Sequence, residues 1–158
     1  MKFHTKWRQF AALFVIILAA GACGSDDEKS EEEIQLNKLV GAWTMASVDN
    51  DGVDRSDEYP GMKVTLSGNF TEGGKYNMAS TASSWPDKSP WLANDTWKFD
   101  PAAISSIIVR HDDTLEMTYT LSNSDSNLTI EFDYSGPGYN NGRTASVGGH
   151  WIFKFTRQ

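Results

Sequence analysis

The sequence has only one cysteine, Cys23, among its 158 residues. A single cysteine cannot form an internal disulfide, which excludes the small secreted scaffolds that disulfides hold together. Stability must therefore come from a hydrophobic core, and a chain of this length has room for one domain of ordinary size.

Histidines are also scarce, and beyond the first 22 residues only His111 and His150 occur. Neither belongs to a recognisable nucleophile motif. Three carboxylates, Glu116, Glu131 and Asp133, fall on the polar face of predicted strands, so we interpret them as solvent-facing groups and not as a glycosidase pair. We expect no enzymatic activity and no cofactor.

Positive charge is low, because three of the 14 Lys and Arg residues lie within the first ten positions. Residues 23–158 carry the other 11 cations and all 21 carboxylates, a formal charge of −10. A surface this acidic disfavours binding to nucleic acid or to anionic lipid. The acidic stretch "DNDGVD" at 49–54 lacks the spacing of a calcium loop, and a hairpin turn at Asp51-Gly52 accounts for it. We expect no metal site.

Long apolar runs are absent except for Phe10–Ala20, which has 11 residues. A helix that crosses a membrane needs about 17 to 25 apolar residues. The run follows the cations Lys2, Lys6 and Arg8, which is typical of a secretory signal peptide. We therefore predict a signal peptide over residues 1–22.

Small residues lead into Cys23, and two interpretations are open. Ala20-Gly21-Ala22 is an ordinary cleavage site that leaves a free thiol, or the run resembles the lipobox of bacterial lipoproteins, in which the cysteine is lipidated. An exposed terminal thiol is a reactive liability in an oxidising compartment, which favours lipidation of Cys23. Two or more acyl chains anchor a protein stably, so a membrane attached through this lipid is an expected partner.

Six acidic residues lie within the ten positions after Cys23, "GSDDEKSEEE". We predict that residues 23–33 form an acidic tether, which at full extension spans about 35 Å over ten residues. The serine and acidic residues also resemble the export signal that sends Bacteroidetes lipoproteins to the outer face of the outer membrane. That resemblance implies a surface-exposed lipoprotein, with a periplasm-facing one as the alternative.

Beyond the tether, the sequence predicts a short helix and then strands. Ser30 and Glu33 form a capping box that predicts a helix from Glu31 to Lys38. From Gly41 onward the hydrophobic period is two, which indicates strands. The predicted strands cover 43–48, 62–67, 75–79, 95–99, 104–110, 115–121, 128–134 and 145–156. With no crossover helices, about eight strands predict an all-β antiparallel domain over residues 34–158, either an up-and-down barrel or a β-sandwich.

Four short motifs, "LVGAW", "FTEGGKY", "WKFD" and "GGHWIFKFTRQ", are similar to the lipocalin-like domains found as lipoproteins in Bacteroidetes. The match to that family's opening L-x-G-x-W pattern is carried by Leu39, Gly41 and Trp43, and the match to its closing W-x-F strand by Trp151 and Phe153. The resemblance implies a lipocalin-like barrel. Such a barrel is filled by its side chains or holds one small ligand, and the many inward aromatics here favour a filled interior with a site at the mouth.

Two polar loops rich in aromatic residues are the candidate ligand site. The members of this candidate site are Trp85, Asp87, Trp91, Asn94 and Asp95 in "SSWPDKSPWLANDTW", and Tyr139, Asn141 and Arg143 in "SGPGYNNGR". Aromatic rings stack on sugar faces while amides, carboxylates and guanidinium groups bond hydroxyls, so a small apolar or glycan ligand is expected. One alternative is that the tryptophans fold back against the barrel. Another is that the aromatic loop is a protein interface of an accessory subunit in an outer-membrane complex.

Overall fold

The computed structural model describes residues 28–86, 89–111, 113–136, 138 and 147–158. The elements, in chain order, are α1 (Glu31–Leu39), β1 (Gly41–Asn50), β2 (Val53–Asp54), the 3-10 turn η1 (Ser56–Glu58), β3 (Lys63–Ser67), β4 (Tyr76–Thr81), β5 (Asn94–Phe99), β6 (Ile107–Arg110), β7 (Glu116–Ser122), β8 (Asn127–Tyr134) and β9 (Gly149–Arg157). The predicted helix is therefore confirmed, with one more residue at its C-terminal end than expected.

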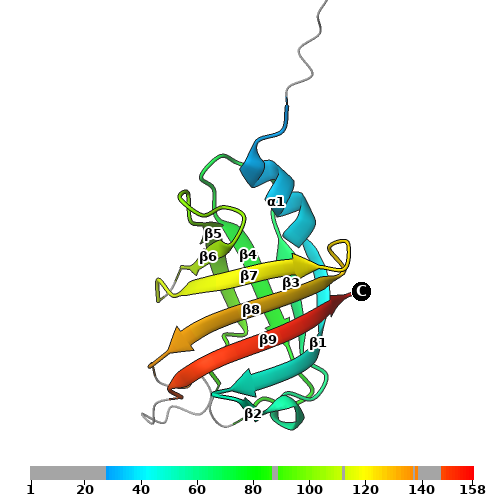
Figure 1. The fold of residues 1–158 in the computed structure, drawn as a ribbon, viewed down its shortest axis with the longest axis vertical. Helices are drawn as coiled ribbons and strands as arrows, with labels where there is room; N and C mark the ends of the chain where they lie inside the picture. Colours follow the sequence, from blue (N-terminus) through cyan, green and yellow to red (C-terminus); the bar gives the residue numbers. More distant parts are fainter. Residues whose placement is uncertain (1–27, 87–88, 112, 137, 139–146) are drawn as a thin grey trace, which may run out of the picture.

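The strands form one closed antiparallel barrel (Figure 1). From β3 to β9 each strand pairs with the next along the chain, and β1 closes the ring by pairing with both β3 and β9. The short β2 pairs with β1 alone, so eight strands make up the barrel. This is the up-and-down arrangement that eight-stranded lipocalin barrels have, and it excludes the sandwich.

Local sequence accounts for the places where the strands differ from expectation. The hairpin of β1 and β2 turns on Asp51 and Gly52, which both have positive φ, as a two-residue primed turn requires. The predicted strand 104–110 begins later, at Ile107, because turns stabilised by hydrogen bonds from Ala103 N to Asp100 O and from Ser106 N to Ala103 O occupy its first residues. The last strand begins at Gly149, and residues 145–146 lie outside the described part.

Side chains alternate inward and outward along the strands, and the inward set is apolar and aromatic. In β3, β4 and β7 buried and exposed residues alternate one for one at the start of each strand. The rings of Phe132, Phe153 and Phe155 stack across β8 and β9, with centroids 5.9 and 6.3 Å apart. The expectation of a barrel filled by aromatic side chains agrees with this core.

Helix α1 covers one end of the barrel (Figure 1). Its first turn is capped by Ser30 Oγ, which accepts from Glu33 N at 3.1 Å. Leu36 and Leu39 are buried in the core. Glu32 holds the helix to the barrel, because its carboxylate accepts from the Tyr76 hydroxyl at 2.7 Å and from Gly73 N at 3.0 Å.

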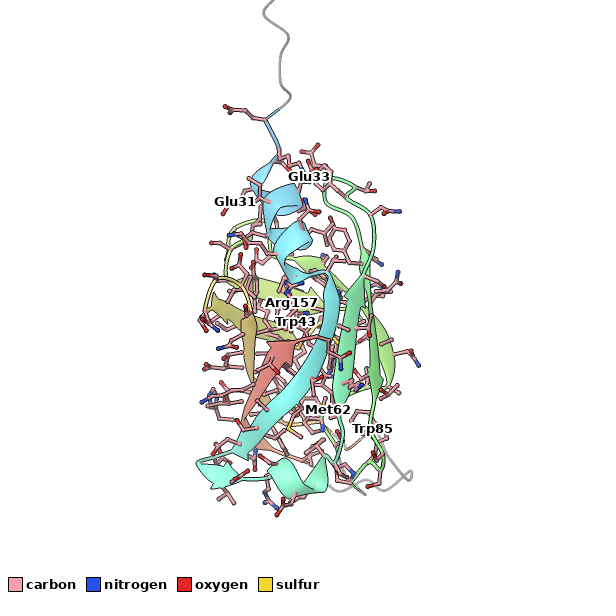
Figure 2. The ribbon with its side chains drawn as sticks, turned by 90° about the vertical axis from the view of Figure 1, so that its right-hand side faces the viewer. Glu31, Glu33, Trp43, Met62, Trp85 and Arg157 are labelled. Carbon is pink, nitrogen blue, oxygen red and sulfur yellow. The ribbon has the colours of Figure 1, made fainter. Side chains whose placement is uncertain are left out.

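An arginine from the last strand closes the same end. The guanidinium of Arg157 lies 4.3 Å above the Trp43 ring and donates to the carbonyl oxygens of Val40 and Lys38 at the end of α1. Trp43 in turn donates from its indole to Leu39 O at 2.9 Å. Figure 2 shows Trp43 and Arg157 together beneath the helix. The Arg157 cation thus stacks on the Trp43 ring, and its N–H groups supply hydrogen bonds to carbonyl oxygens at the C-terminus of α1.

The barrel therefore has two different ends. The up-and-down order places segments 68–75, 100–106 and 123–126 at the α1 end. At the opposite end, which we call the mouth end, it places the described residues 51–62, 82–86, 89–93, 111, 113–115, 135–136 and 147–148. The described residues of the first aromatic loop, 83–86 and 89–93, belong to the mouth end, and most of the second loop lies outside the described residues. Among the described residues, no helix has the length and apolar character needed to span a membrane.

Candidate ligand site at the mouth end

The structure brings some of the predicted site residues together, and others lie outside the described part. Asp87, Tyr139, Asn141 and Arg143 are among the undescribed residues, as is Cys23.

Trp85 lies at the mouth end, far from α1 (Figure 2). It is partly buried and packs against the core. Its ring meets Tyr59 edge to face, with centroids 6.2 Å apart, and Tyr59 makes the same kind of contact with Trp151 at 6.4 Å. Trp85 is thus the outermost ring of an aromatic layer, and part of it is open to solvent.

Trp91 lies inside the barrel, as the alternative of a tryptophan folded back against the barrel predicts. Only 1 % of its surface is exposed. Its ring centroid lies 4.7 Å from that of Phe153, and its indole nitrogen donates to Ser80 Oγ at 2.6 Å. A large apolar ring with a satisfied N–H is stable in such a place. Trp91 therefore offers no open face for stacking in this conformation.

The two polar candidates at the start of β5 point in different directions. Asn94 is exposed at the first position of the strand. The side chain of Asp95 is 1 % exposed, and its Oδ2 lies 3.8 Å from Nε of Arg110. Asp95 therefore belongs to a buried ion pair, with Asn94 at the rim.

Arg110, which was not among the predicted site residues, is the centre of the polar groups in this region. The side chain is 1 % exposed and faces inward from β6. It donates to both carboxylate oxygens of Asp113 and, from Nη1, to Pro90 O at 2.9 Å. It also lies 5.8 Å from the Tyr134 ring centroid. The alternation of the strand could have indicated this, because Arg110 is two residues after Ile108 and therefore lies on the same inward face of β6.

Ser80, Asp95 and Arg110 lie on three neighbouring strands and together form what we call the polar wall. Ser80 has the same parity as Met78 in β4, where alternate residues are buried. The aromatic residues of β8 and β9 lie across the barrel interior from the polar wall. One inner surface therefore carries polar groups and the opposite surface carries aromatic rings, with the Trp91 ring in contact with both.

Two further hydroxyl groups complete this region. Ser89 is fully buried; its Oγ accepts from Trp91 N at 3.0 Å and from the Tyr59 hydroxyl at 3.4 Å. Burial raises the pKa of Tyr59 to about 12, against a smaller lowering by the bond to Ser89. Tyr59 therefore remains a neutral hydrogen-bonding group at physiological pH.

The residues that we interpreted as solvent-facing lie on the outer surface. Glu116 is exposed on β7. His150 Nδ1 lies 3.0 Å from Asp133 Oδ1, and Nε2 lies 3.9 Å from Glu131 Oε2. Of these groups, only His150 lines the surface pocket of about 610 Å³ between β9 and the β1–β2 hairpin. Among the described residues no group of three His, Cys, Asp or Glu side chains is arranged to hold a metal ion.

The comparisons with known proteins add little to this geometry. No protein-family model matches the chain, and no curated protein matches it. Among solved structures, the chain is similar to one described as "The Siderocalin Ex-FABP functions through dual ligand specificities". The identity is 12 %, the match covers 77 % of this chain and 74 % of that chain, and the TM-score is 0.49. This similarity is too low to support a fold assignment, and the barrel is assigned from the strand pairing alone.

Proposed function

We propose that this protein is a non-enzymatic binding protein that takes a small apolar or glycan ligand at the mouth end of its barrel. The observation that carries the proposal is the polar wall of Ser80, Asp95 and Arg110, which faces an aromatic surface with the partly open Trp85 ring at its rim. Binding sites for small molecules have this character: they are largely apolar and contain a few polar groups that orient the ligand.

We further propose that Cys23 carries a lipid anchor on the outer face of the outer membrane, as a lipoprotein would. The described chain leads from residue 28 into α1, at the end of the barrel opposite the mouth. An anchor on Cys23 then places the α1 end nearest the membrane and leaves the mouth facing away from it. A surface protein that captures a ligand from the medium needs this orientation.

The binding function can be tested by titrating the purified full chain with a panel of fatty acids and oligosaccharides. Tryptophan emission reports binding. We expect a saturable change with at least one class of ligand, and Trp85→Ala should weaken binding by about tenfold because a stacked ring is lost. Phe70→Ala is the matched control, because Phe70 is 38 % exposed and lies in segment 68–75 at the α1 end. No response to either class contradicts the binding function, and binding unchanged in Trp85→Ala contradicts the position of the site.

Replacement of the cysteine tests the anchor separately. Cys23→Ala should release the protein in soluble form from a membrane fraction, while Cys23→Ala and the unmodified chain should bind the same ligands. Continued membrane retention of the variant would refute the lipid anchor. Protease treatment of whole cells distinguishes the two faces of the outer membrane, because only a surface-exposed domain is accessible to the enzyme.

A further inference from the structure

The barrel interior at the mouth end is filled by a piece of chain that belongs to no strand. Residues 89–91, which we call the plug, enter the barrel from the loop between β4 and β5. The Trp91 ring donates to Ser80 on β4 and packs on Phe153 of β9. Because β1 and β3 separate β4 from β9 in the sheet, a ring that touches both lies across the interior of the barrel.

The plug satisfies the polar wall with two groups that a small molecule can also supply. The Trp91 indole donates one hydrogen bond to Ser80 Oγ, and the Pro90 carbonyl accepts one from Arg110 Nη1 at 2.9 Å. The remainder of the contact is a flat ring against Phe132, Phe153 and Phe155, with centroids 6.0, 4.7 and 6.0 Å away. The plug thus presents a donor, an acceptor and a flat ring to the barrel interior, as a small aromatic ligand would.

The plug takes no part in the hydrogen bonds that pair β4 with β5. The Cα partners of β4 and β5 run from Tyr76 and Trp97 to Ala79 and Asn94, and one further bond joins Ser80 N to Ala93 O. None of these ladder bonds involves residues 89–91. A molecule that replaces the plug therefore does not have to break the sheet, only the contacts of the plug.

We propose that the space held by the plug is a binding chamber for a flat aromatic molecule that carries an N–H donor and a neutral carbonyl group, and that this ligand enters by displacing residues 89–91. The inference rests on the proposed function and names the ligand class for the same end of the barrel. A neutral carbonyl is specified because Arg110 already pairs with Asp113 and lies 3.8 Å from Asp95. A carboxylate would add another negative charge to this buried group, at a high desolvation cost.

Calorimetric titration with N-acetyl-L-tryptophanamide tests the chamber, because this probe has the ring, the N–H and uncharged carbonyls. In the full chain with Trp91→Gly, we expect the association constant to rise about tenfold or more over the unmodified chain, since the ring no longer competes. N-acetyl-L-tryptophan, which differs by its carboxylate, should bind this variant about tenfold more weakly at neutral pH. Equal binding of amide and acid, or no gain in the variant, overturns the proposal.

Two variants separate a specific chamber from an ordinary hole in the core. Adding Ser80→Ala to Trp91→Gly should abolish the preference for the probe over its N-methylindole analogue, because the acceptor of the indole N–H is gone. Trp97→Gly removes the same ring from a strand, where no loop can leave to admit the amide groups. A gain in Trp97→Gly equal to that in Trp91→Gly would mean that any cavity suffices and would overturn the proposal.

Folding of each variant is checked by far-ultraviolet circular dichroism. If Trp91→Gly does not fold, Trp91→Leu retains apolar packing and carries the same comparison, with an expected gain of about threefold because the space is only partly opened. The chamber and the mouth site can fail separately. If the unmodified chain binds fatty acids or glycans through Trp85 but a folded Trp91 variant does not bind the probe, the chamber is rejected and the ligand site at Trp85 stands.

Discussion

Replacement of Arg110 by methionine gives the sharpest test of the buried polar group at the mouth end. Methionine keeps most of the apolar length of the side chain but removes the bonds to Asp113 and Pro90 O and the partner of Asp95. The side chain of Asp95 is 1 % exposed, so its carboxylate cannot reach water in place of the guanidinium.

The expected cost is large for a domain of this size. Removing one partner of a buried ion pair destabilises a protein by about 3 to 5 kcal/mol. Natural domains have unfolding free energies of roughly 5 to 15 kcal/mol, so Arg110→Met should remove a large part of the free energy of unfolding. Chemical denaturation followed by tryptophan emission and circular dichroism, extrapolated to water, measures the change.

A compensated variant shows whether the cost comes from uncompensated charge. Arg110→Met combined with Asp95→Asn and Asp113→Asn removes the charges and keeps the oxygens that accept from Thr96 N and Leu115 N. We expect it to recover about 2 kcal/mol relative to the single change. The exposed Lys98→Met on β5 is the control and should change the free energy by less than about 0.5 kcal/mol. A cost below about 1 kcal/mol for Arg110→Met, or no recovery in the compensated variant, would refute the reasoning.

Three further predictions concern the rest of the barrel. The pKa values of Tyr59 and Tyr76 are each raised to about 12, so the contribution of these two groups to stability is constant below about pH 10 and is lost as the pH rises from about 10 to 12, because the unfolded phenols ionise first. Tyr59→Phe should flatten this fall in alkaline denaturation, and an unchanged profile contradicts the assignment. Arg157→Lys should lower the unfolding free energy by about 1 to 3 kcal/mol, since lysine keeps the charge but not the planar stack or the bonds to two helix carbonyls; a neutral effect in urea denaturation argues against the contact. Glu32→Gln should cost about 1 to 2 kcal/mol, and the matched change at the exposed Glu31 of the same helical turn, Glu31→Gln, less than half of that; equal effects would show that the bond from the Tyr76 hydroxyl is unimportant.

The fold class could be predicted from local patterns in the sequence. Period-two alternation predicts strands, the absence of crossover helices makes them antiparallel, and Ser30 predicts the start of α1. The Asp51-Gly52 turn and the placement of the aromatic loops between strands follow from the same local chemistry. In an up-and-down barrel the order of strands along the chain also fixes which connections share an end, so strand order alone predicts that connections far apart in sequence lie near each other.

The side chains that fill the barrel at the mouth end are set by contacts between residues distant in sequence. A tryptophan in a loop has the same local sequence signal whether its ring points to solvent or into the barrel, so the sequence left both outcomes open for Trp85 and Trp91. The choice depends on partners that are distant in sequence, such as Ser80 for the Trp91 indole and Arg110 for the Pro90 carbonyl. Arg110 itself was missed because a buried cation is stable only when the fold supplies its carboxylates, and those come from a neighbouring strand and a turn that the period-two pattern cannot bring together.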